Sequence, residues 1–196
     1  DWKDGIQKLK LPNKELIFFL QPLSIDGILT NFISLCEMIE KIQPDYCLNV
    51  KPHPLDVNSI LLRKIRNQFS INIISNNKPT EILLIYFNNI INCFSTVAFD
   101  YYFIAKHLAN LKNSRIINLL IGDEIINTTN KLNFNIKKIP QYKIGINIFD
   151  KGSLKTFLEK VFNNNHSNSI EWKKIDPSTF NNPFEKIKTT LYRSIA

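Results

Sequence analysis

The sequence predicts an α/β fold, in which a parallel sheet is covered by helices on both of its faces. Two observations carry this prediction. Short apolar runs alternate along the chain with longer stretches in which apolar residues recur every three or four positions. The runs are apolar along most of their length, which is typical of strands that are buried on both faces of a parallel sheet.

The first half of the chain contains three predicted strands and three predicted helices. Apolar runs predict strands at residues 15–20, 45–50 and 71–75. Helical spacing of apolar residues predicts helices at residues 27–42 and 57–69. Pro79 precedes a third, short helix at residues 80–87, because proline is favoured at the start of a helix.

The second half continues the alternation, and its signal then weakens. Strands are predicted at residues 89–93 and 116–121, with a helix at residues 95–108 between them. The pattern beyond them indicates a helix at 122–132, a short strand at 145–149 and a helix at 153–163. Ser153 is expected to cap this last helix, whose apolar side chains fall on one face.

The charge of the chain favours anionic partners other than nucleic acid. The 25 Lys and Arg residues against 17 Asp and Glu give a net charge of +8. The basic residues are scattered and form no run of five, so an arm that binds nucleic acid is not expected. The charge favours a weak, salt-sensitive contact with an anionic membrane surface.

The cysteine spacing and the amino-acid composition limit which sites and locations can be predicted. Cys36, Cys47 and Cys93 are widely spaced without a CxxC pair, so neither a disulfide framework nor a metal site is expected. Unpaired cysteines favour a reducing, cytoplasmic location. The 31 Ile and 25 Asn residues indicate an AT-rich genome, so no single Asn or Lys is to be over-interpreted.

The loops after the strands hold the candidate site residues, because ligands bind parallel sheets at the carboxyl ends of their strands. The loop after the second predicted strand reads Lys51-Pro52-His53-Pro54. Prolines on both sides fix the backbone of His53, and an imidazole beside a lysine suits a phosphate oxygen. The absence of GxGxxG and GxxxxGK[ST] excludes a dinucleotide fingerprint and a P-loop.

Two more loops carry candidate ligand-binding residues. Ser95 and Thr96 follow the fourth predicted strand and open a helix, where hydroxyls, free N–H groups and the helix dipole attract an anion. Ordinary helix capping is the alternative for this pair. Glu81 opens the helix after the third strand, where a carboxylate accepts from ribose hydroxyls or complements the helix dipole.

The combination of these loops is more specific than any one of them. Glu81 lies 28 residues after His53, and Ser95 follows 14 residues later. The pattern resembles the nucleotide-binding half of bacterial sialyltransferases and polysialyltransferases with the two-Rossmann (GT-B) architecture, which share an HP motif and a downstream Ser/Thr pair. The similarity covers about residues 15–120. Capsule-polymer transferases and CDP-glycerol glycerophosphotransferases resemble it more loosely.

The resemblance implies a reaction and a role for each residue. The implied ligand-binding residues are Lys51, His53, Pro54, Glu81, Ser95 and Thr96. His53 would be catalytic, helping the phosphate of CMP to leave, while Ser95 and Thr96 bind the same phosphate and Glu81 holds the ribose. The implied activity is an inverting transfer of sialic acid from CMP-sialic acid to a glycan hydroxyl in surface polysaccharide or lipooligosaccharide synthesis, without metal or another cofactor.

The resemblance also implies a missing part. Enzymes of this kind take their general base from an amino-terminal domain, and residues 1–14 are expected to be a linker or the remnant of one. Residues 15–165 are expected to form the Rossmann-like, nucleotide-sugar-binding domain, and residues 166–196 a tail with one helix. Two alternatives stay open: a transferase with a CDP-linked or other nucleotide donor, and a non-catalytic domain that binds nucleotide or glycan.

Overall fold

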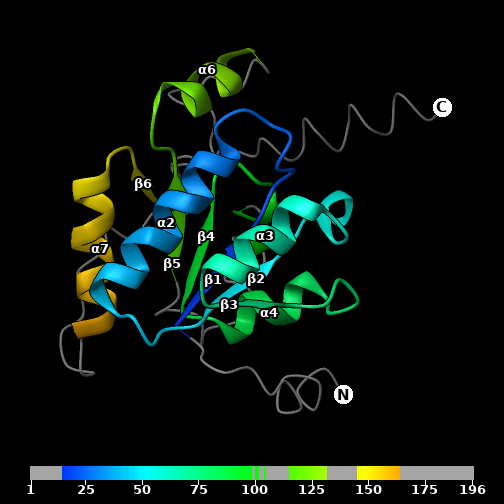
Figure 1. Ribbon diagram of the computed structural model, residues 1–196, viewed down its shortest axis with the longest axis horizontal. Coiled ribbons are helices and arrows are strands. Elements are labelled where there is room, and N and C mark those ends of the chain that lie inside the picture. Colours follow the sequence, from blue (N-terminus) through cyan, green and yellow to red (C-terminus); the bar gives the residue numbers. More distant parts are fainter. Residues whose placement is uncertain (1–14, 99, 102–103, 105–114, 132–144, 164–196) are drawn as a thin grey trace.

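A six-stranded parallel sheet lies at the centre of the protein (Figure 1). The computed structural model describes residues 15–98, 100–101, 104, 115–131 and 145–163. The strands lie in the order β3-β2-β1-β4-β5-β6, and all neighbours are parallel. This is the strand order of a Rossmann fold, so the predicted α/β class is confirmed. The expected linker at 1–14 and tail at 166–196 lie outside the described residues.

All six predicted strands are present. They are β1 (Leu16–Phe19), β2 (Leu48–Lys51), β3 (Ile71–Ile73), β4 (Asn89–Asn92), β5 (Arg115–Leu119) and β6 (Ile146–Ile148). Several predicted strands extend too far at the carboxyl end, because apolar residues such as Leu20 and Leu120 stay buried after the strand has ended. Burial alone therefore does not mark the end of a strand.

The helices that connect the strands also follow the predicted order. They are α2 (Ile28–Ile42), α3 (Ile60–Gln68), α4 (Thr80–Tyr86), α6 (Asp123–Lys131) and α7 (Lys151–Asn163). A helical segment also follows β4, of which Val97, Ala98, Asp100, Tyr101 and Ile104 are described. None of the helices in the described part of the chain is long and apolar enough to cross a bilayer.

Two predicted helix starts are wrong. The helix expected from residue 57 begins at Ile60, because Pro54–Asp56 form a 3₁₀ turn, η1, and the Ser59 hydroxyl accepts from the backbone N–H of Leu62 (3.0 Å). The last helix begins at Lys151 and not at Ser153. Asp150 is its cap: the carboxylate accepts from the Ser153 N–H (2.8 Å) and hydroxyl (2.7 Å), which holds the pKa of Asp150 below its usual range.

Different helices cover the two faces of the sheet. One face packs against α2, α3 and α7, which lie side by side in front of the sheet in Figure 1. In this layer the rings of Phe18 on β1 and Phe32 on α2 lie 5.3 Å apart. The other face, which carries Ile17 and Phe19, packs against α4 and the helical segment after β4. The strands are therefore buried on both sides, which explains their apolar sequences.

Candidate anion-binding site

The candidate site lies where the strand order reverses. β2 and β3 lie on one side of β1 in the sheet, and β4, β5 and β6 lie on the other side. In sheets of this order, ligands bind in the crevice outside the carboxyl ends of the strands at that point. His53 follows β2 and Ser95 follows β4, so the structure brings them to either side of the loop after β1. With strands about 4.8 Å apart, their two strands are separated by about 10 Å.

The His53 side chain is held by its own turn. Its Nδ1 accepts a hydrogen bond from the backbone N–H of Leu55 at 3.3 Å, and Pro54 occupies the first position of η1. In the neutral ring the proton is then on Nε2, because Nδ1 serves as the acceptor. His53 is half-buried. Its remaining polar atom is therefore a hydrogen-bond donor, as contact with an anionic oxygen requires.

The Lys51 side chain is directed to the neighbouring loop. Its amine donates to the backbone carbonyls of Ser75 (2.9 Å) and Lys78 (3.0 Å), between β3 and α4. Burial lowers the pKa of Lys51. Because an ammonium group has three protons, one is left for a ligand. The main observed role of Lys51 is to hold the loop that leads to α4.

The Ser95-Thr96 turn is held on both sides. The Ser95 N–H donates to Asn92 Oδ1 (3.0 Å), and the Ser95 hydroxyl oxygen accepts from the Val97 N–H (3.2 Å). The second contact is the capping role that the sequence left open for this residue. It uses the oxygen of Ser95 as an acceptor and leaves the hydroxyl proton as a donor. Thr96 is exposed.

Glu81 has an acidic neighbour that sequence reasoning missed. Glu81 is exposed in the first turn of α4. Desolvation, with the nearby charge of Glu81 as a second cause, raises the pKa of Asp100. Asp100 lies one helical turn after Thr96, and its N–H donates to the Thr96 carbonyl (3.3 Å). The four-residue spacing from Thr96 was the signal in the sequence that could have identified Asp100. The structure places the two carboxylates near each other beside the candidate site.

Two buried polar side chains connect the loops to one another, and both were missed. The Asp56 carboxylate accepts from the backbone N–H of Leu23 (2.9 Å), which joins η1 to the loop after β1. Gln21 Oε1 accepts from the Phe94 N–H (2.8 Å), which joins the loop after β1 to the loop after β4. Gln21 and Asp56 are each only 9% exposed. The loops at this edge therefore form one hydrogen-bonded unit.

Asparagines form rungs across one face of the sheet. Each lies on a different strand, directly after an isoleucine or leucine: Asn49, Asn72, Asn92, Asn118 and Asn147. Asn92, Asn118 and Asn147 are in register on β4, β5 and β6, and Asn49 is in register with Asn72.

The longer rung ends at the Ser95 turn. Asn118 Nδ2 donates to Asn147 Oδ1 (2.9 Å), and Asn92 Nδ2 donates to Asn118 Oδ1 (3.2 Å). Asn92 Oδ1 then accepts from the Ser95 N–H. Sequence reasoning missed this rung. The available signal was the repeated aliphatic-Asn pair within successive strands, and the rung fixes the backbone of a candidate ligand-binding residue.

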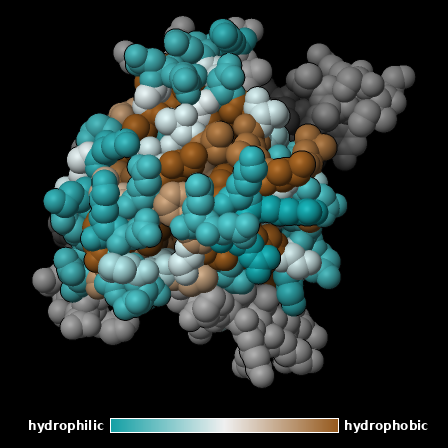
Figure 2. Space-filling model, in the orientation of Figure 1, coloured by the Kyte–Doolittle hydropathy of each residue, from teal (hydrophilic) through white to brown (hydrophobic). Residues whose placement is uncertain are grey.

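An apolar surface borders the site. The exposed side chains of η1 and α3 include Leu55, Val57, Ile60 and Leu61, of which Leu55 is 78% and Ile60 71% exposed. Figure 2 shows apolar surface toward the start of α3, among otherwise hydrophilic side chains. Leu55 is also the residue whose N–H binds the His53 ring. The apolar surface and the candidate catalytic histidine therefore belong to the same turn.

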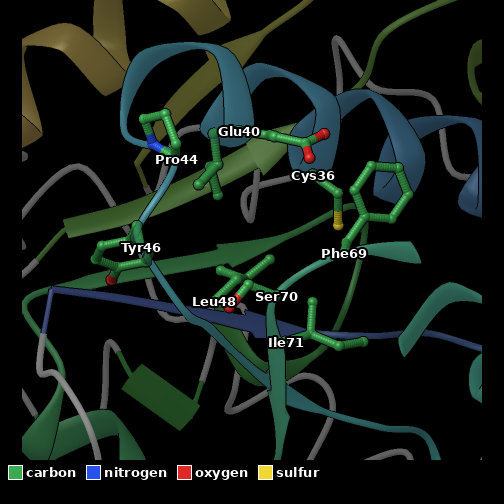
Figure 3. A pocket seen from close by; sticks show the side chains of 9 residues that line it. Cys36, Glu40, Pro44, Tyr46, Leu48, Phe69, Ser70 and Ile71 are labelled. Atoms are coloured by element: carbon green, nitrogen blue, oxygen red, sulfur yellow. The ribbon is translucent and has the colours of Figure 1, made fainter. Parts of the chain in front are cut away.

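A small cavity lies at the opposite end of the sheet. Its volume is about 40 Å³, and Cys36, Tyr46, Phe69 and Ile71 are among the residues that line it (Figure 3). These residues precede or begin β2 and β3, or lie on α2, so the cavity is separate from the candidate site. Among the described residues, no three His, Cys, Asp or Glu side chains are placed to hold a metal ion.

Comparison with known proteins identifies the fold. No protein-family model matches the sequence, and no curated protein matches it. The structure of the Methanocaldococcus jannaschii UDP-GlcNAc 2-epimerase in complex with UDP-GlcNAc and UDP is similar over 83% of this chain, with a TM-score of 0.50 and 16% identity. The likeness supports a Rossmann-like domain of the kind that GT-B proteins contain.

Two more solved structures are similar at lower scores. Thermosulfurimonas dismutans KpsC, a beta Kdo 2,4 transferase, matches 57% of this chain and 36% of its own, with a TM-score of 0.40 and 16% identity. The Candida albicans trehalose-6-phosphate phosphatase N-terminal domain matches 83% of this chain and 42% of its own, with a TM-score of 0.41 and 13% identity. This chain spans 42% of the epimerase, so it corresponds to less than half of that protein.

Proposed function

We propose that this chain is the nucleotide-binding half of a glycosyltransferase that uses a nucleotide sugar, with CMP-sialic acid as the donor and a glycan hydroxyl as the acceptor. The observation that carries the proposal is the placement of His53 and Ser95 on either side of the strand-order reversal, at the carboxyl ends of β2 and β4. Rossmann-like sheets bind nucleotides there. The epimerase with the similar fold is complexed with UDP-GlcNAc and UDP, which supports a nucleotide-sugar ligand.

The chemistry of the site agrees with a phosphate leaving group. When a glycosidic bond to a nucleotide breaks, negative charge develops on the phosphate. His53 Nε2, the hydroxyl protons of Ser95 and Thr96, and the third proton of Lys51 are all donors to such a charge. His53 would then assist departure of CMP by hydrogen bonding or by proton donation. Glu81, with Asp100 beside it, would accept from the ribose hydroxyls.

The proposal includes a second unit that closes the crevice and supplies the general base. The exposed apolar side chains of Leu55 and Ile60 at this edge support it, because a covering domain would bury them. The share of the epimerase that this chain spans also supports it. We therefore expect the chain alone to bind CMP in the presence of EDTA and to transfer little or no sialic acid from CMP-sialic acid.

Calorimetric titration with CMP in EDTA tests the proposal. Loss of a hydrogen bond to a charged group costs about 1.5–3 kcal/mol, so His53→Ala should weaken CMP binding about 10- to 150-fold. Ser95→Ala should cost only about 0.5–1.5 kcal/mol, or about 2- to 12-fold, because backbone N–H groups at the start of the helix remain as donors to the phosphate. Asn67→Ala, an exposed position on α3, is the control and should bind as the wild type does.

Three results are decisive. Tighter binding of UMP, CDP or GDP than of CMP would keep the nucleotide-sugar class and replace the donor. Equal CMP affinity of the wild type and His53→Ala would remove the phosphate role of His53. A wild-type chain that binds none of these nucleotides would contradict the proposed function as a whole.

A further inference from the structure

Gln21 lies between the loops of the candidate site, and the NH₂ group of its side chain has no hydrogen-bond partner among the described residues. Gln21 is 9% exposed and follows β1 by two residues. Its Oε1 accepts from the Phe94 N–H at 2.8 Å. Within the described part of the chain, no residue accepts a hydrogen bond from its Nε2 group. Buried amide groups usually have both ends satisfied, so this NH₂ group is unusual.

The burial of the free amide group is incomplete. The only fully enclosed side-chain N or O atom without a partner among the described residues is Asn89 Oδ1, at the start of β4. The Gln21 NH₂ group is therefore not fully enclosed by the protein. A nearly buried polar group that keeps an unused hydrogen-bond donor is suited to bind a ligand.

The strand order places this group between the two predicted phosphate-binding loops. β1 lies between β2, which leads to His53, and β4, which leads to Ser95. Gln21 is therefore about one strand spacing, ~4.8 Å, from each neighbouring strand. A phosphate that contacts both His53 and Ser95 would lie above the end of β1, and Gln21 lies two residues beyond that end.

We infer that Gln21 is a ligand-binding residue whose Nε2 group donates a hydrogen bond to a phosphate oxygen, while its Oε1 holds the Ser95-Thr96 turn through Phe94. The inference rests on the proposed function where it names a nucleotide as the ligand. The binding of a phosphate group by Gln21 does not depend on which phosphate compound is bound. No bond is broken by Gln21, and it remains neutral throughout. Its two hydrogen bonds couple the position of the phosphate to the position of the turn that binds it.

Gln21→Glu tests the NH₂ group of the side chain separately from its oxygen. The variant keeps an oxygen for the Phe94 N–H and replaces the NH₂ group by a second carboxylate oxygen, which repels phosphate. Loss of a donor to a charged group corresponds to about 10- to 150-fold in affinity, so we expect CMP binding to weaken at least about 30-fold. Cytidine, which lacks the phosphate, should change less than about 3-fold, because a neutral ligand is not repelled.

The matched control makes the same chemical change elsewhere. Gln68→Glu replaces an exposed glutamine at the end of α3 and should leave the affinity for CMP unchanged. The thermal midpoint of each variant shows whether it is folded. If Gln21→Glu does not fold, Gln21→Met supplies the measurement. It removes the NH₂ donor without adding a charge, and it also removes the oxygen that accepts from the Phe94 N–H. It should weaken CMP binding about 10- to 150-fold.

Each outcome separates the inference from the proposed function. A wild-type chain that binds CMP as tightly as folded Gln21→Glu or Gln21→Met overturns the role of Gln21 and leaves the proposed function standing. A wild-type chain that binds no nucleotide contradicts the proposed function. The inference is then decided with inorganic phosphate: weakened binding in Gln21→Glu supports it, and equal binding or no binding by the wild type overturns it.

Discussion

The carboxylate of Asp56 accepts a hydrogen bond from the backbone N–H of Leu23 at 2.9 Å, across the gap between the turn after β2 and the loop after β1. The two residues are 33 positions apart in the sequence, and both are buried. The turn that holds His53 therefore has a fixed position relative to the loop that holds Gln21. The contact therefore fixes the two loops relative to each other in the folded domain without a bound ligand.

Removal of the Asp56 carboxylate should destabilise the domain. Asp56→Ala leaves the buried N–H of Leu23 without its charged partner, which costs about 1.5–3 kcal/mol of the free energy of unfolding. Urea denaturation measures the loss. Asp45→Ala is the control, because Asp45 is exposed before β2 and should change stability by less than about 0.5 kcal/mol. Similar losses in the two variants would show that the Asp56–Leu23 contact contributes nothing.

Gly27, at the start of α2, should not tolerate a side chain. Its φ is +83°, and a β-carbon there would lie 2.6 Å from the backbone nitrogen of Ile125 on α6. Gly122 has a φ of +91° with no atom within 4 Å of such a carbon, so it is a matched control for backbone strain alone. Gly122→Ala should cost about 1–2 kcal/mol, which is the cost of a left-handed conformation.

The difference between the two glycine variants measures the contact with α6. Overpacking against backbone should make Gly27→Ala worse than Gly122→Ala by about 1–3 kcal/mol of unfolding free energy. Urea denaturation of the two variants side by side gives this number. Equal costs would mean that α6 moves away freely, and that it does not fix the loop after β1.

The sheet could be predicted from the sequence, and the contacts that organise its edge could not. Strands and helices follow from the spacing of apolar residues, which is a local property. The Gln21–Phe94 contact joins residues 73 positions apart, and the Asn92–Asn118–Asn147 rung requires the register of three strands. The repeated aliphatic-Asn pairs indicate which side chains could meet, but a local pattern contains neither the sequence separation nor the register that brings them together. His53 and Ser95 are candidates because each lies in the loop after a strand, which a local pattern does predict.

Burial of Cys36 should make the protein less stable at alkaline pH. Desolvation in the core raises the pKa of this thiol from 9.0 to about 12, and the charges of Glu37 and Glu40 add to the shift. Because the pKa is higher in the folded state, the contribution is complete below pH 9 and is lost as the pH rises toward 12. The loss should be about 1.4 kcal/mol per pH unit in this window.

The contribution of Cys36 can be isolated by comparing variants. Between pH 9.5 and 11, stability of Cys36→Ala should fall less steeply than that of the wild type, by about 1.4 kcal/mol per pH unit. Ser34→Ala, buried on the same helix without a titrating group, should keep the wild-type slope. Urea denaturation under reducing conditions gives the slopes. Parallel curves for the wild type and Cys36→Ala would disprove the assignment.

Asn118 should contribute more to stability than any exposed asparagine, because it is the central member of the β4–β6 rung. It is 2% exposed, accepts from Asn92 and donates to Asn147. Asn118→Leu removes both hydrogen bonds while filling the space, and should cost about 2–4 kcal/mol. Asn130→Leu, an exposed position on α6, is the control and should stay within about 0.5 kcal/mol of the wild type.

Asn118→Asp tests whether hydrogen bonding or mere polarity matters at this position. The variant keeps an acceptor for Asn92 Nδ2 but turns a carboxylate toward Asn147 Oδ1, so burial should raise the pKa of the new carboxyl group. A raised pKa means that stability is greatest when the group is protonated and falls as the pH rises. Relative to the wild type, the variant should therefore be less destabilised at pH 4 than at pH 7 in urea denaturation. A loss that does not depend on pH, together with a small loss for Asn118→Leu, would mean that the rung does not hold the strands together.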